Sequence, residues 1–341
     1  MKDIAFVHAV EAGPLEAQSI LLCKSIRLLE GIFGDSTIFA VTPRDGPPLS
    51  SKTLEMYEDL RVVYLRRNVN VSWKDYPFVN TTYAAATVEE EFGDKFEYMI
   101  LTDTDTFFMS DPYSLCFDPE SYLVALKPCD SLAPEIAVSF GSKLPSFWRK
   151  VYQICEVEEG DLWPVTTTVD SVRIYAYFNN GIVSVDPRTR IFTQAISYLE
   201  AAAKELFFLK LKKGSIERFY LDQAFLSAVI TKLGEENVLL LEKEYNMPYL
   251  QFRSLEKRFR GTIKHVHYHD AFYFRSSVKA FRGVQRVFPL LEENLPLPFP
   301  LAAILFLKTK RLIPQEFRNL LRGTPLMSVI NFIGKLVRIE F

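Results

Sequence analysis

An apolar run that ends in two aspartates is the feature that most restricts the fold of this 341-residue chain. Residues 98–101 read Tyr-Met-Ile-Leu without apolar–polar alternation, which is typical of a strand buried on both faces of a parallel sheet. Asp103 and Asp105 follow within the sequence Thr-Asp-Thr-Asp-Thr. In open α/β sheets, ligands bind beyond the carboxyl ends of the strands, where we expect these two carboxylates to lie.

Two carboxylates one residue apart at the end of a strand can both reach a hard divalent cation. Such a cation is commonly held by one or two carboxylates together with the phosphates of a substrate. Asp103 and Asp105 therefore suggest a metal that binds a diphosphate. The alternative is that both aspartates only form turns, through hydrogen bonds to the nearby backbone.

The remaining pattern alternates strands and helices. We predict strands at residues 4–7, 37–41, 61–65, 122–126 and 181–185. We predict helices from Ala17 to about Gly31, from a cap at Asn80 or Thr81 to Gly93, and from Glu217 to Leu233. This alternation predicts an α/β fold with a mixed, mostly parallel sheet and helices on both faces.

Composition restricts the class of protein and its partners. An apolar content of 48 % and a charged content of 24 % are those of an ordinary globular protein, and a net charge of −2 gives no electrostatic reason to bind nucleic acid. The four widely separated cysteines suggest reduced thiols. The chain begins with a strand pattern and contains no apolar run of about 18–20 residues, so we expect a cytoplasmic protein.

The sequence changes character near its C-terminal end. We expect a main domain at residues 1–287 and a Pro-rich, then basic and amphipathic helical extension at 288–341. Residues 301–341 contain seven basic and two acidic residues. The extension could lie on the inner face of an anionic membrane, or it could pack its apolar side against the main domain.

Three later segments carry polar groups in suggestive positions. Asn179, Asn180 and Gly181 come directly before a predicted strand, as if the backbone had to approach a ligand closely. Asp222 and Gln223 interrupt an otherwise apolar helical face. The strand-like residues 264–269 carry histidines at 265, 267 and 269, which would point to one side of an extended strand.

These segments, in this order, resemble the nucleotide-sugar glycosyltransferases of the GT-A fold, and most of all glycosyltransferase family 8, which includes glycogenin and bacterial lipopolysaccharide galactosyltransferases. The resemblance extends from about Ile4 to Arg275. It implies a Rossmann-like GT-A domain that transfers a hexose from a UDP-sugar to a carbohydrate or lipid-linked glycan, with the anomeric configuration retained. It also implies that Asp103 and Asp105 bind Mn²⁺ or Mg²⁺, with His267 or, nearly as well, His265 as a further ligand.

The resemblance implies roles for other residues as well. Asp222 would bond the sugar hydroxyls, Gln223 would lie by the anomeric carbon, and Asn179 would contact the donor sugar or the acceptor. The loop after the first strand, His8 to Glu11, would line the nucleoside, with His8, Ala9 and Glu11 as its contacts. Tyr83 and Thr104 would make further donor contacts. The family's Lys-Pro-Trp is replaced here by other residues after His269, which leaves Arg275 or Lys279 as the candidate cation.

Two other functions share parts of this pattern. Haloacid-dehalogenase-like phosphatases also begin from a strand that ends in Asp-x-Asp, but they need Thr or Val where this chain has Phe107. A sugar-nucleotide-binding protein without catalytic activity would keep the fold and lose the metal, and the intact aspartate pair argues against it.

Overall fold

The computed structural model describes residues 3–132, 135–248 and 263–269 of the chain. All of these belong to one compact unit, Met1–His269. Residues 270–341 lie outside the described part of the chain. They include the predicted domain boundary at 287/288, the predicted C-terminal extension, and Arg275 and Lys279.

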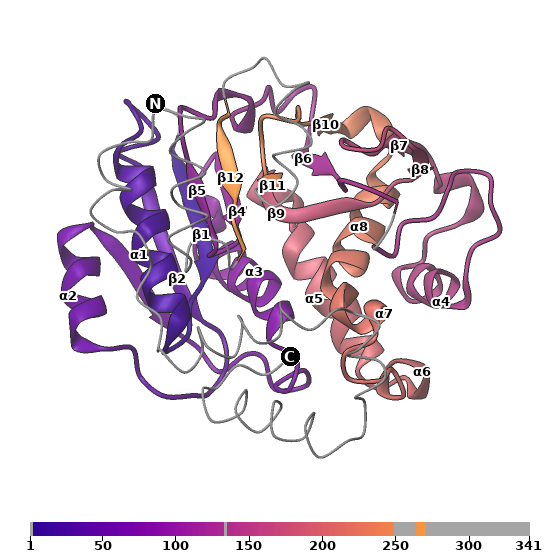
Figure 1. Ribbon diagram of the computed structural model, residues 1–341, viewed down its shortest axis with the longest axis horizontal. Helices are drawn as coiled ribbons and strands as arrows, with labels where there is room; N and C mark the ends of the chain where they lie inside the picture. The colour runs from indigo at the N-terminus through magenta and orange to yellow at the C-terminus, as the bar shows by residue number, and fades with distance from the viewer. Residues whose placement is uncertain (1–2, 133–134, 249–262, 270–341) are drawn as a thin grey trace, which may run out of the picture. The chain divides into compact units, whose positions relative to one another are not determined.

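A seven-stranded sheet forms the centre of this unit (Figure 1). Its strands, in spatial order, are β10 (Val238–Leu240), β6 (Val124–Pro128), β9 (Phe178–Val185), β4 (Tyr98–Thr102), β1 (Ile4–Ala9), β2 (Thr37–Thr42) and β3 (Val62–Arg66). β9 runs antiparallel to both of its neighbours, and every other pairing in the sheet is parallel. The predicted mixed, mostly parallel sheet is therefore confirmed.

Helices cover both faces of the sheet because alternate strand residues point to opposite sides. The helices are α1 (Pro14–Arg27), α2 (Ser51–Asp59), α3 (Asn80–Phe92), α4 (Ser146–Cys155), α5 (Ile191–Ala202), α6 (Leu206–Leu209), α7 (Ile216–Phe219) and α8 (Leu221–Leu233). Ala5, Val7 and Met99 face a core formed with α3, α4, α5 and α8. Phe6 and Ile100 face a second core formed with α1 and α2.

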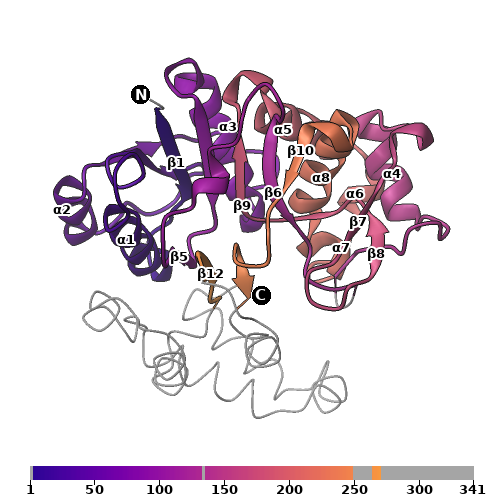
Figure 2. The same ribbon diagram turned by 90° about the horizontal axis from the view of Figure 1, so that it is seen from above.

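Smaller elements complete the fold. A three-stranded sheet contains β11 (Met247–Pro248), β12 (His265–His267) and β5 (Thr106–Phe108), and a two-stranded sheet contains β7 (Pro164–Thr166) and β8 (Arg173–Tyr175). Figure 2 shows β5 and β12 beside the main sheet. The 3₁₀ helices are Pro77–Val79, Gly93–Lys95, Tyr113–Leu115, Glu159–Asp161, Pro187–Thr189 and Glu235–Asn237.

Three helices differ from the sequence prediction. α1 spans Pro14–Arg27, so it begins and ends earlier than the predicted Ala17 to about Gly31. Asn80 does not cap α3, because it lies inside the first turn and its side chain bonds Asn70 and Glu11 instead. The single helix predicted at Glu217–Leu233 is broken at Tyr220, whose φ of −108° and ψ of 22° are not helical. Asp222 consequently lies in the first turn of α8, where the helix dipole favours a negative charge.

No helix among the described residues is long and apolar enough to cross a bilayer. Cys23, Cys129 and Cys155 are buried, Cys116 is half-buried, and none of the four forms a disulfide.

The backbone of β9 at Gly181 has no room for a side chain. A Cβ there would lie 2.6 Å from Asn246 Oδ1 and 3.0 Å from Asn179 Oδ1. The Asn246 side chain cannot easily move away, because it is buried and its amide donates to Asn179 over 2.6 Å. The sequence suggested that a ligand approaches this glycine, whereas the structure places the Asn246 amide there.

We predict that Gly181→Ala lowers the free energy of unfolding by about 1–3 kcal/mol, the usual cost of overpacking. Urea denaturation followed by circular dichroism measures this difference. Gly160→Ala is the matched control, since a Cβ at Gly160 would meet no atom within 4 Å. A Gly181→Ala protein as stable as the parent would contradict the packing argument.

Candidate metal and donor site

The loop after β4 is fixed by hydrogen bonds at its start. The Asp103 backbone N–H donates to Gly181 O of β9 over 3.0 Å, and the Thr106 hydroxyl donates to Asp103 O over 2.6 Å. The buried Thr104 hydroxyl donates to Ala9 O at the end of β1. Because β9 is antiparallel, its first residues lie at the same edge of the sheet as the carboxyl end of β4.

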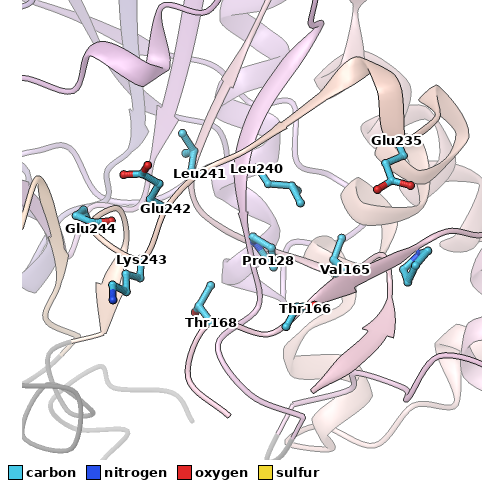
Figure 3. Close-up of a pocket in the computed structure, with 11 residues that line it drawn as sticks. Pro128, Val165, Thr166, Thr168, Glu235, Leu240, Leu241, Glu242, Lys243 and Glu244 are labelled. Atoms are coloured by element: carbon cyan, nitrogen blue, oxygen red, sulfur yellow. The ribbon is translucent and has the colours of Figure 1, made fainter. Parts of the chain in front are cut away.

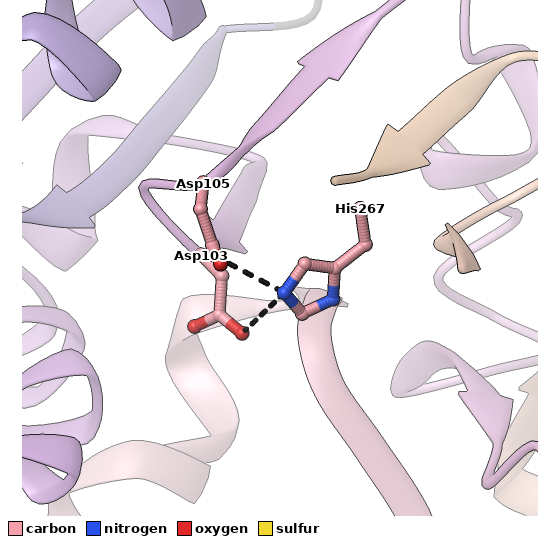
Figure 4. A group of neighbouring side chains, drawn as sticks. All are labelled: Asp103, Asp105 and His267. Carbon is pink, nitrogen blue, oxygen red and sulfur yellow. Dashed lines mark ion pairs between the residues drawn. The ribbon is translucent and has the colours of Figure 1, made fainter. Parts of the chain in front are cut away.

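The register of the small sheet brings a histidine to the two aspartates. In the antiparallel pair of β5 and β12, His267 lies opposite Thr106, the residue that follows Asp105. Its Nε2 lies 3.2 Å from Asp105 Oδ1 and 3.8 Å from Asp103 Oδ2 (Figure 4). One ligand atom from each of the three residues lies within 4.8 Å of the other two. Two carboxylates and an imidazole at these distances fit a divalent cation such as Mn²⁺.

The site is partly open to solvent and rich in negative charge. The side chains of His267, Asp103 and Asp105 are 10 %, 23 % and 26 % exposed. Burial raises the pKa of Asp103 to about 7, helped by the charges of Asp105 and Asp222, while His267 opposes the shift. The carboxylates hold the pKa of His267 at about 9 despite its burial, and the imidazolium keeps the pKa of Asp105 well below its usual range. A protonated His267 thus supplies positive charge that a metal ion would also supply.

Asp222 lies next to this cluster and is held by two neutral donors. Its Oδ1 lies 2.8 Å from the Tyr76 hydroxyl, and its Oδ2 accepts from Asn180 Nδ2 over 2.8 Å. Burial raises the pKa of Asp222, and both hydrogen bonds oppose that shift. The neighbouring Gln223 is also buried and donates its amide to the Tyr177 hydroxyl. A carboxylate and an amide therefore stand side by side at the first turn of α8.

Asn179 is engaged within the protein. Its Oδ1 accepts from the backbone N–H of Gly181 over 2.8 Å and from Asn246 Nδ2 over 2.6 Å. The structure thus brings Asn180, and not Asn179, to Asp222. The sequence could have suggested either residue, because the two amides are adjacent and the register of β9 decides which side each one faces.

The histidines of 264–269 do not form one row. Only residues 265–267 are strand, and His269 lies beyond it with a φ of 52°. The His269 ring nevertheless stacks on His267, with centroids 4.0 Å apart. His265 is fully buried against Phe108, with centroids 4.6 Å apart, and it is not part of the Asp103–Asp105–His267 cluster. The structure therefore favours His267 over His265.

The residues expected to line the nucleoside are scattered. His8 and Ala9 belong to β1 and not to a loop, and His8 is buried with its Nε2 2.6 Å from Ser19 Oγ. Burial lowers the pKa of His8 to about 3. Glu11 pairs with Arg44, whose Nη2 donates over 2.8 Å. Tyr83 is buried on α3 and donates its hydroxyl to Glu200.

One group that the sequence analysis missed is the buried Lys127 in β6. Its Nζ contacts Asp130 Oδ1 at 2.5 Å and donates to Asn246 O over 3.0 Å. A lysine inside the apolar run Val-Ala-Leu-Lys-Pro was a signal, because lysine is rarely buried without a partner. Lys127 holds Asn246 in place beside Gly181, and Asp130 is its ion-pair partner.

An open cavity of about 650 Å³ lies at the carboxyl ends of β6 and β10 (Figure 3). Pro128 and Leu240, the last residues of those strands, form part of its wall. Its polar lining includes Thr166, Thr168 and Glu242. β6 is separated from β4 only by β9, so the cavity opens along the same edge as Asp103.

Comparison with known proteins identifies a family. Residues 6–234 match the profile of the Rhodobacterales glycosyltransferase domain. The search of curated proteins finds no match. The match to the glycosyltransferase profile favours a glycosyltransferase over the phosphatase that the Asp-x-Asp sequence also suggested.

Solved structures of glycosyltransferases are similar to this chain. The galactosyltransferase LgtC, in complex with donor and acceptor sugar analogs, is 14 % identical, with 86 % of this chain and 100 % of that chain covered and a TM-score of 0.48. The apo form of mouse xyloside xylosyltransferase 1 is 13 % identical, with 79 % and 97 % covered and a TM-score of 0.40. GlyE of Streptococcus pneumoniae is 12 % identical, with 86 % and 63 % covered and a TM-score of 0.44.

We predict that Asp105→Asn and His267→Ala each weaken Mn²⁺ binding by more than about 100-fold, since loss of a supporting residue alone costs 10- to 100-fold. Titration of Mn²⁺ followed by electron paramagnetic resonance measures the affinity. His265→Gln should retain the affinity of the parent, because that ring lies outside the cluster. Asp94→Asn on the exposed surface is the matched carboxylate control. Unchanged binding in Asp105→Asn would contradict the metal assignment.

Proposed function

Because the chain belongs to the Rhodobacterales glycosyltransferase domain family, we propose that it transfers a hexosyl group from a UDP-sugar in a metal-dependent reaction with retained anomeric configuration. The observation that carries this proposal is the cluster of Asp103, Asp105 and His267 at the carboxyl end of β4. A glycosyltransferase site needs positive charge where the nucleoside diphosphate leaves. These three side chains could bind a metal ion that supplies this charge.

The metal-binding residues would be Asp103, Asp105 and His267, and Mn²⁺ or Mg²⁺ bound there would supply Lewis-acid stabilisation of the departing diphosphate. The metal is best placed at the open side of the cluster, since both carboxylates are about a quarter exposed. The Thr104 hydroxyl keeps the loop against β1, so that the two carboxylates remain on the same side of the sheet edge.

Asp222 and Gln223 would act on the sugar. Asp222 is oriented by Tyr76 and Asn180, so its carboxylate is preorganised to accept hydrogen bonds from sugar hydroxyls. Its negative charge also stabilises an oxocarbenium-like reacting carbon. Gln223 carries no charge, and its amide would orient the anomeric carbon without forming a strong base. The departing phosphate would then take the proton of the acceptor hydroxyl.

The acceptor would bind in the cavity beside β6 and β10. Thr166, Thr168 and Glu242 offer hydroxyls and a carboxylate that suit the hydroxyl groups of a carbohydrate or of a lipid-linked glycan. Part of this lining lies in β7 and in the loop that follows it. Sheet strands lie about 4.8 Å apart and β9 separates β6 from β4, so the cavity would start roughly 10 Å from β4, about the length of two sugar rings.

Asp222→Asn is predicted to lower the kcat/KM for donor consumption by about 10- to 100-fold, the cost of one charged hydrogen bond, while Mn²⁺ binding weakens much less than in Asp105→Asn, because Asp222 is not a ligand. Mass spectrometry of a panel of UDP- and GDP-sugars measures consumption, and NMR of the product's anomeric proton reports the configuration. Tyr76→Phe keeps the carboxylate and should cost less. Glu217→Gln, on α7, is the control. Consumption of GDP-sugars alone would show that the donor class is wrong, and an inverted product would refute retention.

A further inference from the structure

Two short helices beside the site present apolar side chains to solvent. On α6, Leu206 and Leu209 are 62 % and 59 % exposed, and on α7, Ile216 and Phe219 are 41 % and 46 % exposed. Each pair is three residues apart, so its members lie on the same side of their helix. The fully buried Phe208 points the other way and packs on Phe225, with centroids 5.5 Å apart.

Basic residues surround these apolar side chains. Residues 204–219 contain five basic residues and only two acidic ones, although the whole chain has a net charge of −2. Lys210 and Lys212 are exposed between the two helices. Arg218 Nη1 donates to Leu211 O over 3.4 Å, which ties α7 to the end of α6. Figures 1 and 2 both show the two short helices near each other.

The same surface continues to the segment before α3. The ring of Phe78 packs on Phe219 with centroids 4.5 Å apart and is itself 47 % exposed. We call the surface formed by the exposed residues of α6 and α7 with Phe78 the α6–α7 patch. Single exposed apolar residues are normal, but four within 14 residues, interleaved with lysines, need an explanation.

We propose that the α6–α7 patch docks on an anionic lipid surface. Leucine, isoleucine and phenylalanine side chains enter the boundary between headgroups and acyl chains, and lysines next to them are attracted to anionic headgroups. A second copy of the chain is a poorer occupant, because a two-fold interface would bring this positive patch against itself. All residues of the patch belong to the unit Met1–His269.

Docking at this surface would hold the site next to the membrane. The Tyr76 hydroxyl lies 3.0 Å from Phe219 O and 2.8 Å from Asp222 Oδ1, so the patch begins one side chain away from the candidate sugar-binding carboxylate. A lipid-linked acceptor would thus meet the site at the membrane surface. This consequence rests on the proposed function, whereas the docking itself does not.

Flotation of the full chain with vesicles tests the proposal. The vesicles contain phosphatidylcholine alone or phosphatidylcholine with phosphatidylglycerol. The parent should float only with the anionic vesicles and should be released by high salt. Two double variants, Lys210→Glu/Lys212→Glu and Leu206→Ser/Leu209→Ser, change the lysines and the leucines of the patch separately. Each should lower the partition coefficient of the protein between anionic vesicles and water by about tenfold or more. All of these residues are exposed, and circular dichroism checks that the variants fold.

Two controls separate the patch from other surfaces. Lys52→Glu/Leu54→Ser makes the same kind of change on α2, where Leu54 is 37 % exposed, and should leave flotation unchanged. Lys335→Glu/Arg338→Glu measures how much residues 288–341 contribute to vesicle binding. The proposal is overturned by a parent that does not float, or by patch variants that float like the parent. It is also overturned by a parent dimer, seen by light scattering, that the patch variants dissociate. None of these results would alter donor consumption, so the proposed function is tested separately.

Discussion

The convergence of three carboxylates at one edge of the sheet is the electrostatic constraint on which the site depends. Asp103 and Asp105 leave β4, and Asp222 enters from the first turn of α8. Burial raises the pKa of Asp103, and the charges of Asp105 and Asp222 raise it further. Like charges at this spacing are costly unless a cation accompanies them. A protonated His267 supplies one positive charge from β12, and a divalent metal bound by the three side chains would replace that proton and supply two. The fold therefore concentrates negative charge where a glycosyltransferase needs a cation.

Strand direction and register produce this arrangement. Because β9 is antiparallel to β4, its N-terminal residues lie next to the carboxyl end of β4, and Asn180 can reach Asp222. The pairing of β5 with β12 then places His267 opposite Thr106, with its ring next to Asp105. A shift of one residue in this register would turn His267 away from Asp105 and would turn Val266 toward it. The candidate metal site thus depends on a pairing between two strands of only three residues each.

The sequence predicted well those features that depend on local pattern. The apolar runs gave β1, β2, β3 and β4 close to their observed bounds, and the aspartate pair lies at the end of β4 as expected. Features that depend on distant contacts were harder to foresee. Nothing in the local sequence shows that Asn246, 65 residues away, occupies the space above Gly181. The register that separates His267 from His265 is likewise a tertiary property.

The site residues divide in the same way. Asp222 and Gln223 were found because polar residues interrupt an apolar helix, but the break at Tyr220 that sets Asp222 in a first helical turn was not visible in the pattern. The family resemblance assigned His8 to the nucleotide, in a loop after the first strand. In the structure His8 lies in β1 and points toward α1, where its Nε2 forms a hydrogen bond with the Ser19 hydroxyl. Residue type therefore suggested the chemistry, while strand phase decided which side chains face the site.

Calorimetric titration of UDP into the full chain, with and without Mn²⁺, tests the central claim most directly. The cluster of Asp103, Asp105 and His267 should bind the nucleotide's diphosphate through the cation, so UDP should bind when Mn²⁺ is present and bind much more weakly when the metal is removed by a chelator. Equal binding of UDP in both conditions, or no binding in either, would contradict the account.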